Sequence, residues 1–286
     1  MSLLSPKFKQ INDVYPVSSE PCLTIPTSQV CTENQFYEQA YKDICYEIKE
    51  APKTHRKQWE FCYITQTLKH YGLLKPRRSG IGFGVGEEPL PALFASYGCN
   101  IVATDLDEAE AASKGWVDTD QHLRTKEVLN QKEICDTESF DQLVDIKYVD
   151  MNNIPDDLGQ FDFTWSSCAL EHLGNINNSI EFIINSTKLL KPGGIAVHTT
   201  ELNLSNDGLT LDSGSTVLLR ISDFNDLYRR MLNHKDIVLS PFNFFSGNQP
   251  LDTYIDVPPY SPEKHLKLSI GKYVTTSVGI IVRKIF

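Results

Sequence analysis

The sequence predicts an α/β protein built on a doubly wound, mostly parallel sheet, and three observations support this fold class. Five short apolar runs alternate with helical segments between residues 79 and 201, which is typical of βαβ units. Glycines are concentrated in the turn after the first of these runs. The 286 residues are enough for one large domain, and the composition, 41% hydrophobic and 22% charged, is that of a folded globular chain.

Charge, hydropathy and cysteine usage exclude several classes of function. The formal net charge of -10 disfavours binding to nucleic acid or to an anionic membrane. No apolar run approaches the roughly 20 residues of a membrane-spanning helix, so we expect no membrane insertion. Seven cysteines, none in a C-x-x-C pair, predict reduced and mostly buried thiols. We therefore expect a cytoplasmic protein.

Residues 1–75 precede the first predicted strand and are expected to form an N-terminal arm and helices that cover the cleft. Residues 1–31 show neither helical nor strand periodicity and predict an irregular arm. Thr32, followed by Gln35 three residues later, marks the start of a helix through residue 50. Apolar residues from Trp59 to Tyr71 predict a second helix, which ends at Gly72.

Residues 76–286 are predicted to form the main domain, without internal repeats. Its strand-like runs, in order, are SGIGFGVG, NIVATDL, DIKYVDM, FDFTWSSC, GIAVHTTEL, KDIVLSPF and YVTTSVGIIVRK. Helices are expected at residues 89–97, 107–131, 177–190 and 223–233. Two polar insertions, near residues 202–220 and 243–272, follow strands and are expected to cover a substrate.

The turn after the first strand predicts a cofactor site. It reads Gly80-Ile81-Gly82-Phe83-Gly84-Val85-Gly86-Glu87-Glu88, and glycines let a backbone approach a ligand closely. The dinucleotide pattern G-x-G-x-x-G fails in every frame: its third glycine falls on Val85, Glu87 or Pro89. Because two acids follow the last glycine, the pattern favours a cofactor that carries a positive charge and no phosphate.

Five segments resemble, in order and spacing, the motifs of the class I S-adenosylmethionine-dependent methyltransferases. Gly82-x-Gly84-x-Gly86 resembles motif I, and Asp105, 19 residues after Gly86, resembles the acid that binds the ribose hydroxyls. Asp150-Met151 is similar to the segment that cradles the adenine. The segment from Phe161 to Ser167, with Glu171-His172, resembles the fourth-strand motif that meets the substrate, and 189–194 resembles the turn before the fifth strand.

This resemblance covers roughly residues 78–201 and implies a Rossmann-like methyltransferase sheet of seven strands, the last antiparallel. It also implies S-adenosylmethionine as the cofactor. The residues expected to bind this cofactor are Gly82, Gly84, Gly86, Glu88, Asp105, Asp150, Met151 and Ser167.

The sequence departs from the family at one position. The family usually has an acid two residues before the first motif I glycine, where this chain has Gly80. Glu87 or Glu88 is expected to replace that acid as the partner of the methionyl ammonium group, and we favour Glu88. The alternative is that both acids only stabilise the positive N-terminus of the next helix.

Methyl transfer to a hydroxyl group requires alignment of donor and acceptor and removal of one proton. His172, with Glu171 beside it, follows the fourth strand and is the predicted general base, unless it has only a packing role. Glu201, Tyr254 and His265 are the predicted acceptor-binding residues. We assign no metal ligands.

The predicted function is S-adenosylmethionine-dependent O-methylation of a hydroxyl on a sugar or glycan, because polar and aromatic residues dominate the covering segments. Three alternatives stay open: methylation of another small metabolite, a nicotinamide-dependent oxidoreductase, and a catalytically silent cofactor-binding module. The expected partner is a small-molecule or glycan acceptor.

Overall fold

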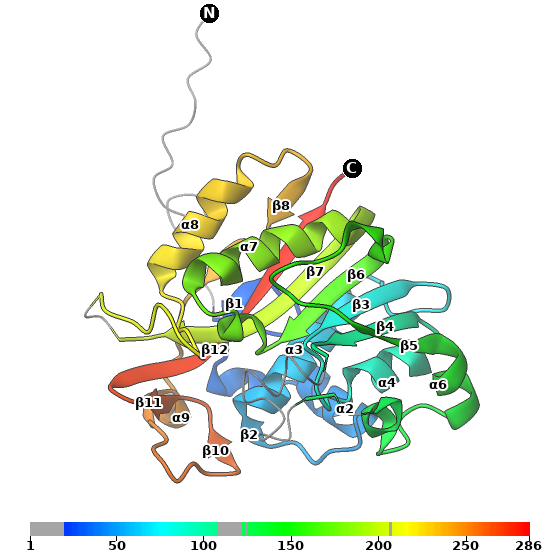
Figure 1. The fold of residues 1–286 in the computed structure, drawn as a ribbon. Helices are drawn as coiled ribbons and strands as arrows, with labels where there is room; N and C mark the ends of the chain where they lie inside the picture. The colour runs from blue at the N-terminus through cyan, green and yellow to red at the C-terminus, as the bar shows by residue number, and fades with distance from the viewer. Residues whose placement is uncertain (1–19, 108–121, 124, 206–207) are drawn as a thin grey trace, which may run out of the picture.

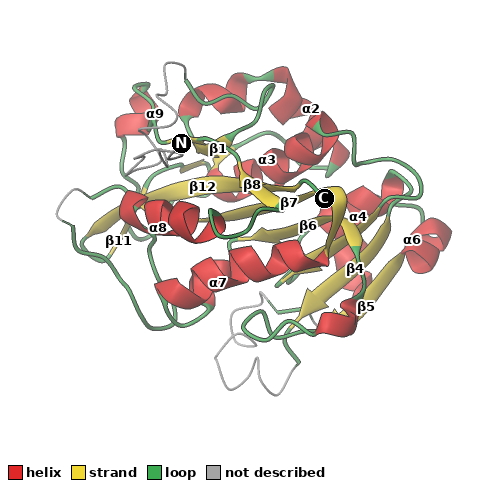
Figure 2. Cartoon of the chain, turned by 90° about the horizontal axis from the view of Figure 1, so that it is seen from above, coloured by secondary structure: helices red, strands yellow, loops and turns green. Residues whose placement is uncertain are grey.

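A central sheet with helices on both faces forms the body of the protein (Figure 1). The structure, a computed structural model, describes residues 20–107, 122–123, 125–205 and 208–286. The predicted arm over residues 1–31 and the predicted helix over 107–131 lie partly outside these residues. Helices form an outer layer on each side of the sheet (Figure 2). Helices α2 (Gln39–Glu47), α3 (Arg56–His70), α4 (Leu90–Ser96) and α6 (Thr137–Leu143) cover one face, and α7 (Ile176–Ser186) and α8 (Ile221–Met231) cover the other.

The strand order confirms the predicted doubly wound sheet. Five strands lie parallel in the spatial order β5 (Val144–Tyr148), β4 (Asn100–Asp105), β3 (Ser79–Phe83), β6 (Phe161–Ser167) and β7 (Leu190–Asn203). The last strand, β12 (Tyr273–Lys284), lies antiparallel to β7, as the resemblance implied. The order of winding reverses between β3 and β6, and small molecules bind at such a point, beyond the carboxyl ends of the strands.

The sheet contains more strands than the seven predicted. The sixth predicted run is β8 (Ile237–Leu239), and the structure adds β1 (Ser28–Val30), β9 (Phe242–Asn243) and β11 (Leu268–Ile270). Strands β11, β1 and β8 pair in turn along one edge of β12, at residues 273–275, 278–279 and 282–284. These short strands protect an edge that would otherwise expose unpaired backbone groups. Strands of two or three residues have too short a pattern to be found by periodicity.

Within the described residues, helix positions differ from the predictions in three places. The described end of the predicted helix over 107–131 holds only the 3-10 helix η3 (Lys126–Asn130). The predicted helix over 32–50 is divided into a 3-10 helix, η1 (Glu33–Tyr37), and α2. Helix α6 was not predicted, because only Phe140 of its seven residues is buried and no amphipathic period develops; its N-cap is Asp136, which accepts the N–H of Ser139 at 2.9 Å. The other 3-10 helices are η4 (Asp156–Leu158), η5 (Leu170–His172) and η6 (Thr187–Leu189).

A small second sheet joins the N-terminal helices to the C-terminal loop. Strand β2 (Thr54–His55), directly before α3, pairs with β10 (Lys264–His265), and α9 (Pro250–Thr253) lies in the same loop. The rings of His55 and His265 stack at this junction, with centroids 4.7 Å apart. In the part of the chain that the structure describes, no helix combines the length and apolar character needed to cross a membrane.

Candidate active site

The turn between β3 and α4 is shaped by glycines that no other residue could replace without strain. Gly84 and Gly86 have positive φ angles of 58° and 50°, a conformation that L-residues with a side chain rarely adopt. A Cβ atom on Gly84 would lie 2.8 Å from Cβ of Ala169 and 3.3 Å from Sδ of Met151. The bare backbone of this turn therefore forms a cradle at the carboxyl edge of the sheet.

Asp105 ends the neighbouring strand β4 and is fixed by backbone donors. Its carboxylate accepts the N–H of Gly86 at 3.1 Å, of Leu123 at 3.0 Å and of Leu106 at 2.8 Å. Asp105 lines a cavity of about 90 Å³ with Gly84, Asp150 and Met151. The structure thus brings together the residues predicted to bind the ribose and the adenine.

A larger cavity of about 830 Å³ lies on the other side of the glycine turn. Gly84, Cys168 and His172 line both cavities, which therefore meet at the ends of β3 and β6. The predicted site residues that line the larger cavity are Gly84, Gly86, Glu88, Ser167, Glu171, His172 and Glu201. The side of Gly82 that a Cβ would occupy is filled instead by Trp165, whose Cζ2 atom would be 2.3 Å away.

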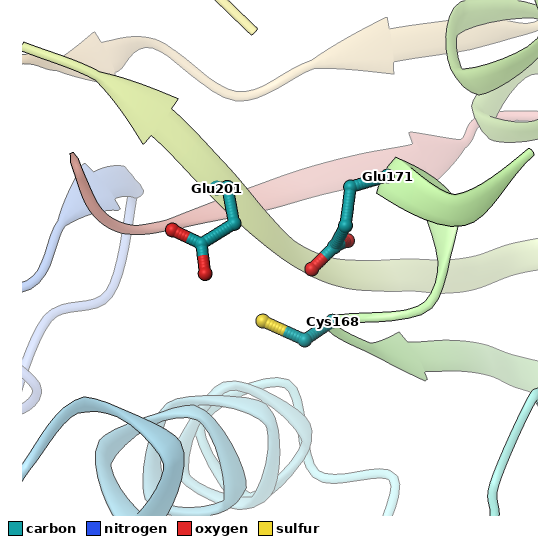
Figure 3. Close-up of side chains that lie close together, drawn as sticks. All are labelled: Cys168, Glu171 and Glu201. Atoms are coloured by element: carbon teal, nitrogen blue, oxygen red, sulfur yellow. The ribbon is translucent and has the colours of Figure 1, made fainter. Parts of the chain in front are cut away.

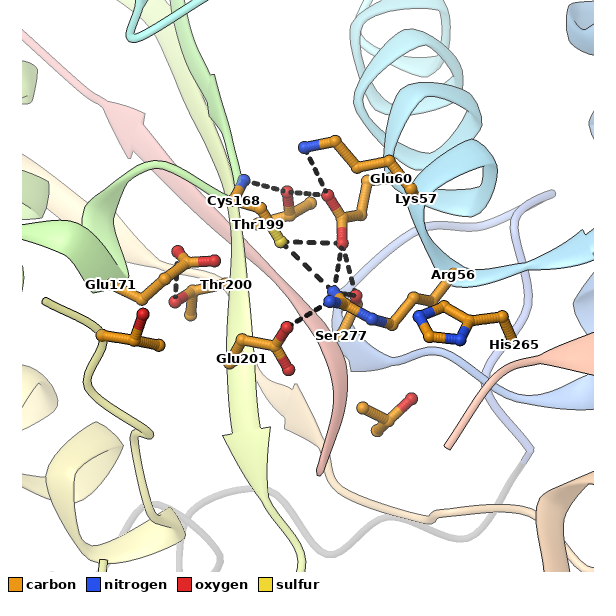
Figure 4. Close-up of polar contacts among 12 residues, drawn as sticks. Arg56, Lys57, Glu60, Cys168, Glu171, Thr199, Thr200, Glu201, His265 and Ser277 are labelled. Carbon is orange, nitrogen blue, oxygen red and sulfur yellow. Dashed lines mark hydrogen bonds and ion pairs between the residues drawn. The ribbon is translucent and has the colours of Figure 1, made fainter. Parts of the chain in front are cut away.

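Three charged residues at the start of α3 lie beside the larger cavity (Figure 4), and two of them, Arg56 and Lys57, line it. Glu60 is fully buried and accepts hydrogen bonds from Ser167 at 3.1 Å and Cys168 at 2.9 Å. Burial alone would raise the pKa of Glu60, but Lys57 and Arg56 outweigh it and hold that pKa below its ordinary value. Glu60 is therefore an ionised carboxylate that ties α3 to the end of β6.

Arg56 connects the same cluster to β7. Its Nη2 forms an ion pair with Oε1 of Glu201, and its Nη1 lies 3.2 Å from Glu60 and 3.1 Å from the hydroxyl of Ser277. Burial raises the pKa of Glu201 to about 7. Nε of Arg56 and Oε2 of Glu201 are both buried and make no hydrogen bond of normal geometry within the described part of the chain.

Glu171, Glu201 and Cys168 point toward one another from η5, β7 and the end of β6 (Figure 3). Each offers one potential metal-ligating atom, and the three atoms lie within 4.8 Å of one another. The guanidinium group of Arg56, which pairs with Glu201 and donates to Sγ of Cys168 at 3.5 Å, already supplies positive charge there. Glu171 also accepts a hydrogen bond from Thr200 at 3.0 Å. The cluster is thus organised around a protein cation.

Glu88 lies at the end of the glycine turn, with only 7% of its surface exposed. It accepts a hydrogen bond from Nε1 of Trp165 at 2.6 Å. Burial raises the pKa of Glu88 to about 8, so this carboxyl group is mostly protonated at pH 7.

His172 lies where the two cavities meet. Its Nδ1 is 2.8 Å from the carbonyl oxygen of Ser215. Because a carbonyl oxygen can only accept, Nδ1 carries the proton, and in the neutral ring Nε2 is the nitrogen that can take one up. This is the tautomer that a general base requires.

Two predicted acceptor residues lie elsewhere. Neither Tyr254 nor His265 lines either cavity. Tyr254 is 45% exposed, and His265 is buried, with its Nδ1 at 2.7 Å from Asp256. The covering segments reach the larger cavity through other residues: Ser215 and Thr216 from 202–220, and Ile270 from 243–272.

The sequence analysis missed Arg56 and Lys57, which line the larger cavity, and Glu60, which is buried behind them. The signal was present in helix α3, which is buried on almost all sides between Gln58 and Leu68. Charged side chains on a helix of this kind must face protein or a cavity.

Comparisons with known proteins agree with this geometry. Residues 80–198 match a family model described as "Methyltransferase domain". A comparison with curated proteins gives no significant match.

Three solved structures are among those to which this chain is similar. A putative sarcosine dimethylglycine methyltransferase from Galdieria sulphuraria is 17% identical, with a TM-score of 0.42, and the match covers 64% of this chain and 60% of that one. A 1,6-didemethyltoxoflavin-N1-methyltransferase from Burkholderia thailandensis is 13% identical (TM-score 0.45; 89% and 82% covered). An O-methyltransferase family protein from Burkholderia thailandensis is 11% identical (TM-score 0.40; 80% and 59% covered). This chain therefore spans less than two thirds of the first and third of these proteins.

Proposed function

We propose that this protein, which belongs through residues 80–198 to the class I S-adenosylmethionine-dependent methyltransferases, methylates a hydroxyl group of a sugar or glycan. When bound, the cofactor supplies an electrophilic methyl group on a sulfonium centre. The glycine cradle at Gly84 and the smaller cavity beside Asp105 fit its nucleoside end, because a carboxylate at a strand end can accept hydrogen bonds from a vicinal diol. Asp150 and Met151 would flank the adenine.

In this proposal His172 removes the proton of the acceptor hydroxyl. Ser215 fixes the imidazole ring with Nε2 as the basic atom, at the junction of the cofactor and acceptor cavities. A positioned base of this kind typically contributes about 100- to 10,000-fold to the rate. Glu171 is held by Thr200 and faces the acceptor cavity beside it.

The observation that carries the acceptor class is the pair formed by Arg56 and Glu201. Arg56 offsets the charge that Glu201 carries when ionised, so the pair favours a neutral group over an ammonium ion. One buried donor, Nε of Arg56, and one buried acceptor, Oε2 of Glu201, lack partners of normal geometry in the described structure. A hydroxyl group is neutral and can both accept and donate, so it suits a wall in which a guanidinium group and a carboxyl group lie side by side.

The described part of residues 1–75 takes part in this proposed site as a cover, because α3 supplies Arg56 and Lys57 to the cavity wall. The segments 202–220 and 243–272 complete the cover through Ser215, Thr216 and Ile270. Enclosure by three parts of the chain suits a small acceptor or the end of a glycan chain. All seven cysteines are free thiols, which supports the proposal of a cytoplasmic protein.

A small amine is the second candidate acceptor. The close approach of Glu171 and Glu201 favours it, because two carboxylates facing one cavity stabilise a positive charge.

The test is to incubate the protein with S-adenosylmethionine and a panel of methyl glycosides, nucleotide sugars, oligosaccharides and small amines, and to follow S-adenosylhomocysteine formation. Methylated products are then assigned by NMR. We expect an O-methyl ether on a sugar. Products methylated only on nitrogen would contradict the sugar proposal, and cofactor binding without any methylated product across the panel would favour a silent binding module.

A further inference from the structure

Position 80 cannot hold the acid that the family usually has there. A Cβ atom on Gly80 would lie 2.1 Å from Cε2 of Phe163. The Phe163 ring is fixed in this place by Phe94, whose ring packs edge-on at a centroid distance of 5.6 Å. Any side chain at position 80 would displace this aromatic packing. The partner of the cofactor's amino-acid end must therefore come from another element.

Strand β6, which carries Phe163, also holds a carboxyl group of the glycine turn in a suitable place. Trp165, two residues after Phe163 on β6, covers Gly82 and donates its Nε1–H to Glu88 at 2.6 Å. Glu88 is buried and lines the larger cavity together with Gly86 and Ser167. Phe163 and Trp165 on β6 thus fill the space beside Gly80 and Gly82 of β3. Trp165 also positions Glu88 in the turn that follows β3.

We propose that Glu88 binds the α-ammonium group of S-adenosylmethionine in place of the acid absent from position 80. If the ribose is held at Asp105 beside the smaller cavity, the amino-acid end of the cofactor would extend along the glycine turn into the larger cavity, which Glu88 lines. A charge-assisted hydrogen bond between a carboxylate and an ammonium group is among the strong polar contacts in proteins. This inference concerns the cofactor and does not depend on the acceptor class.

A consequence is that cofactor binding releases a proton. In the free protein, burial raises the pKa of Glu88 to about 8, and Glu60 and Asp105 act in the same direction. The indole N–H of Trp165 and the cation of Lys57 oppose this rise. An ammonium group at the carboxyl adds a further positive charge and favours its ionised form, so Glu88 gives up its proton to solvent.

Two ligands distinguish a direct contact between Glu88 and the ammonium group from a general effect of the substitution on the glycine turn. S-adenosylhomocysteine carries the amino-acid end, and 5′-methylthioadenosine lacks it. By calorimetry, Glu88→Gln should weaken S-adenosylhomocysteine about 10- to 100-fold and change the affinity for 5′-methylthioadenosine by less than about twofold. Glu87→Gln is the matched control and should leave both affinities near wild type. An equal loss for both ligands, or no loss for either, would overturn the proposal.

The pH dependence of ligand affinity in the wild-type protein gives a second test that needs no variant. Between pH 6 and 8 the affinity for S-adenosylhomocysteine should rise by up to about tenfold per pH unit, since the free carboxyl must lose a proton for the ammonium to bind. At pH 7, titrations in buffers with different ionisation enthalpies should show close to one proton released. The affinity for 5′-methylthioadenosine should stay flat. A flat profile for S-adenosylhomocysteine would overturn the proposal, whereas failure to find a methylated sugar would leave these binding results unaffected.

Discussion

Replacing Arg56 with methionine tests whether the charge cluster on α3 stabilises the fold as its contacts indicate. Methionine keeps much of the length of the side chain but removes the positive charge. Glu201 then loses its ion-pair partner. Glu60 keeps one cationic partner, Lys57, whose Nζ lies 3.5 Å from Oε2 of Glu60. Removing one partner of a buried ion pair typically costs about 3–5 kcal/mol. Because Lys57 partly compensates Glu60, and Glu201 is about half protonated at pH 7, we expect the lower end of this range.

The loss of stability should grow with pH. In the unfolded chain Glu201 is ionised above its ordinary pKa, but in the folded Arg56→Met protein it holds its proton to higher pH than in the wild type. The folded state then binds more protons than the unfolded state, so the free energy of unfolding decreases as pH rises through this window. Between pH 6 and 8 the loss of stability caused by Arg56→Met should increase by roughly 1 kcal/mol. This corresponds to an uptake difference of somewhat less than one proton between the folded and unfolded states over about one pH unit.

Urea denaturation at pH 6, 7 and 8 measures both effects. The matched control is the double variant Arg56→Met/Glu201→Gln, in which the uncompensated carboxylate is also removed. We expect it to be more stable than Arg56→Met at pH 8 and to lose most of the added pH dependence. Wild-type stability of Arg56→Met at pH 8, or an equal loss at pH 6 and pH 8, would refute the electrostatic reasoning.

Three further substitutions test the rest of the site. His172→Asn should lower turnover about 100- to 10,000-fold with nearly unchanged affinity for S-adenosylhomocysteine by calorimetry; near-wild-type turnover would exclude it as the base. Asp105→Ala should weaken S-adenosylhomocysteine by about 1.5–3 kcal/mol, and an unchanged dissociation constant would remove it from the ribose site. Gly84→Ala, at a positive φ and 2.8 Å from Ala169, should lower the urea midpoint and weaken the same ligand, and wild-type values for both would contradict the cradle.

The residues of the smaller cavity could be predicted to lie together because they sit at the ends of consecutive parallel strands. Gly84, Asp105 and Met151 come after β3, β4 and β5, and parallel strands bring their carboxyl ends to one edge of the sheet. Residues with this order and spacing along the chain are therefore close together in the structure, and all three line the smaller cavity. The same reasoning applies to His172, which lies within one short turn of the end of β6.

The acceptor side could not be predicted in the same way, because its residues come from elements with no fixed relation to the sheet. Helix α3 reaches the ends of β6 and β7 only through the packing of residues 56–70 against the sheet, which no spacing encodes. Tyr254 and His265 were selected as aromatic residues in a long loop, yet the loop reaches the cavity through Ile270. Residue type alone does not tell which side of a loop faces a ligand.

The charge cluster also shows how closely helix α3 is joined to the ends of the central strands. Glu60 takes hydrogen bonds from residues on two strands, Cys168 at the end of β6 and Ser277 on β12, while Arg56 pairs with Glu201 on β7. Each of these strand residues would expose an unpaired polar group in the interior if α3 were removed, at a cost of about 1–3 kcal/mol for each buried group. The wall of the larger cavity and the stability of the strand ends thus depend on the same contacts. A substitution chosen to widen the larger cavity at Arg56 should therefore also reduce stability.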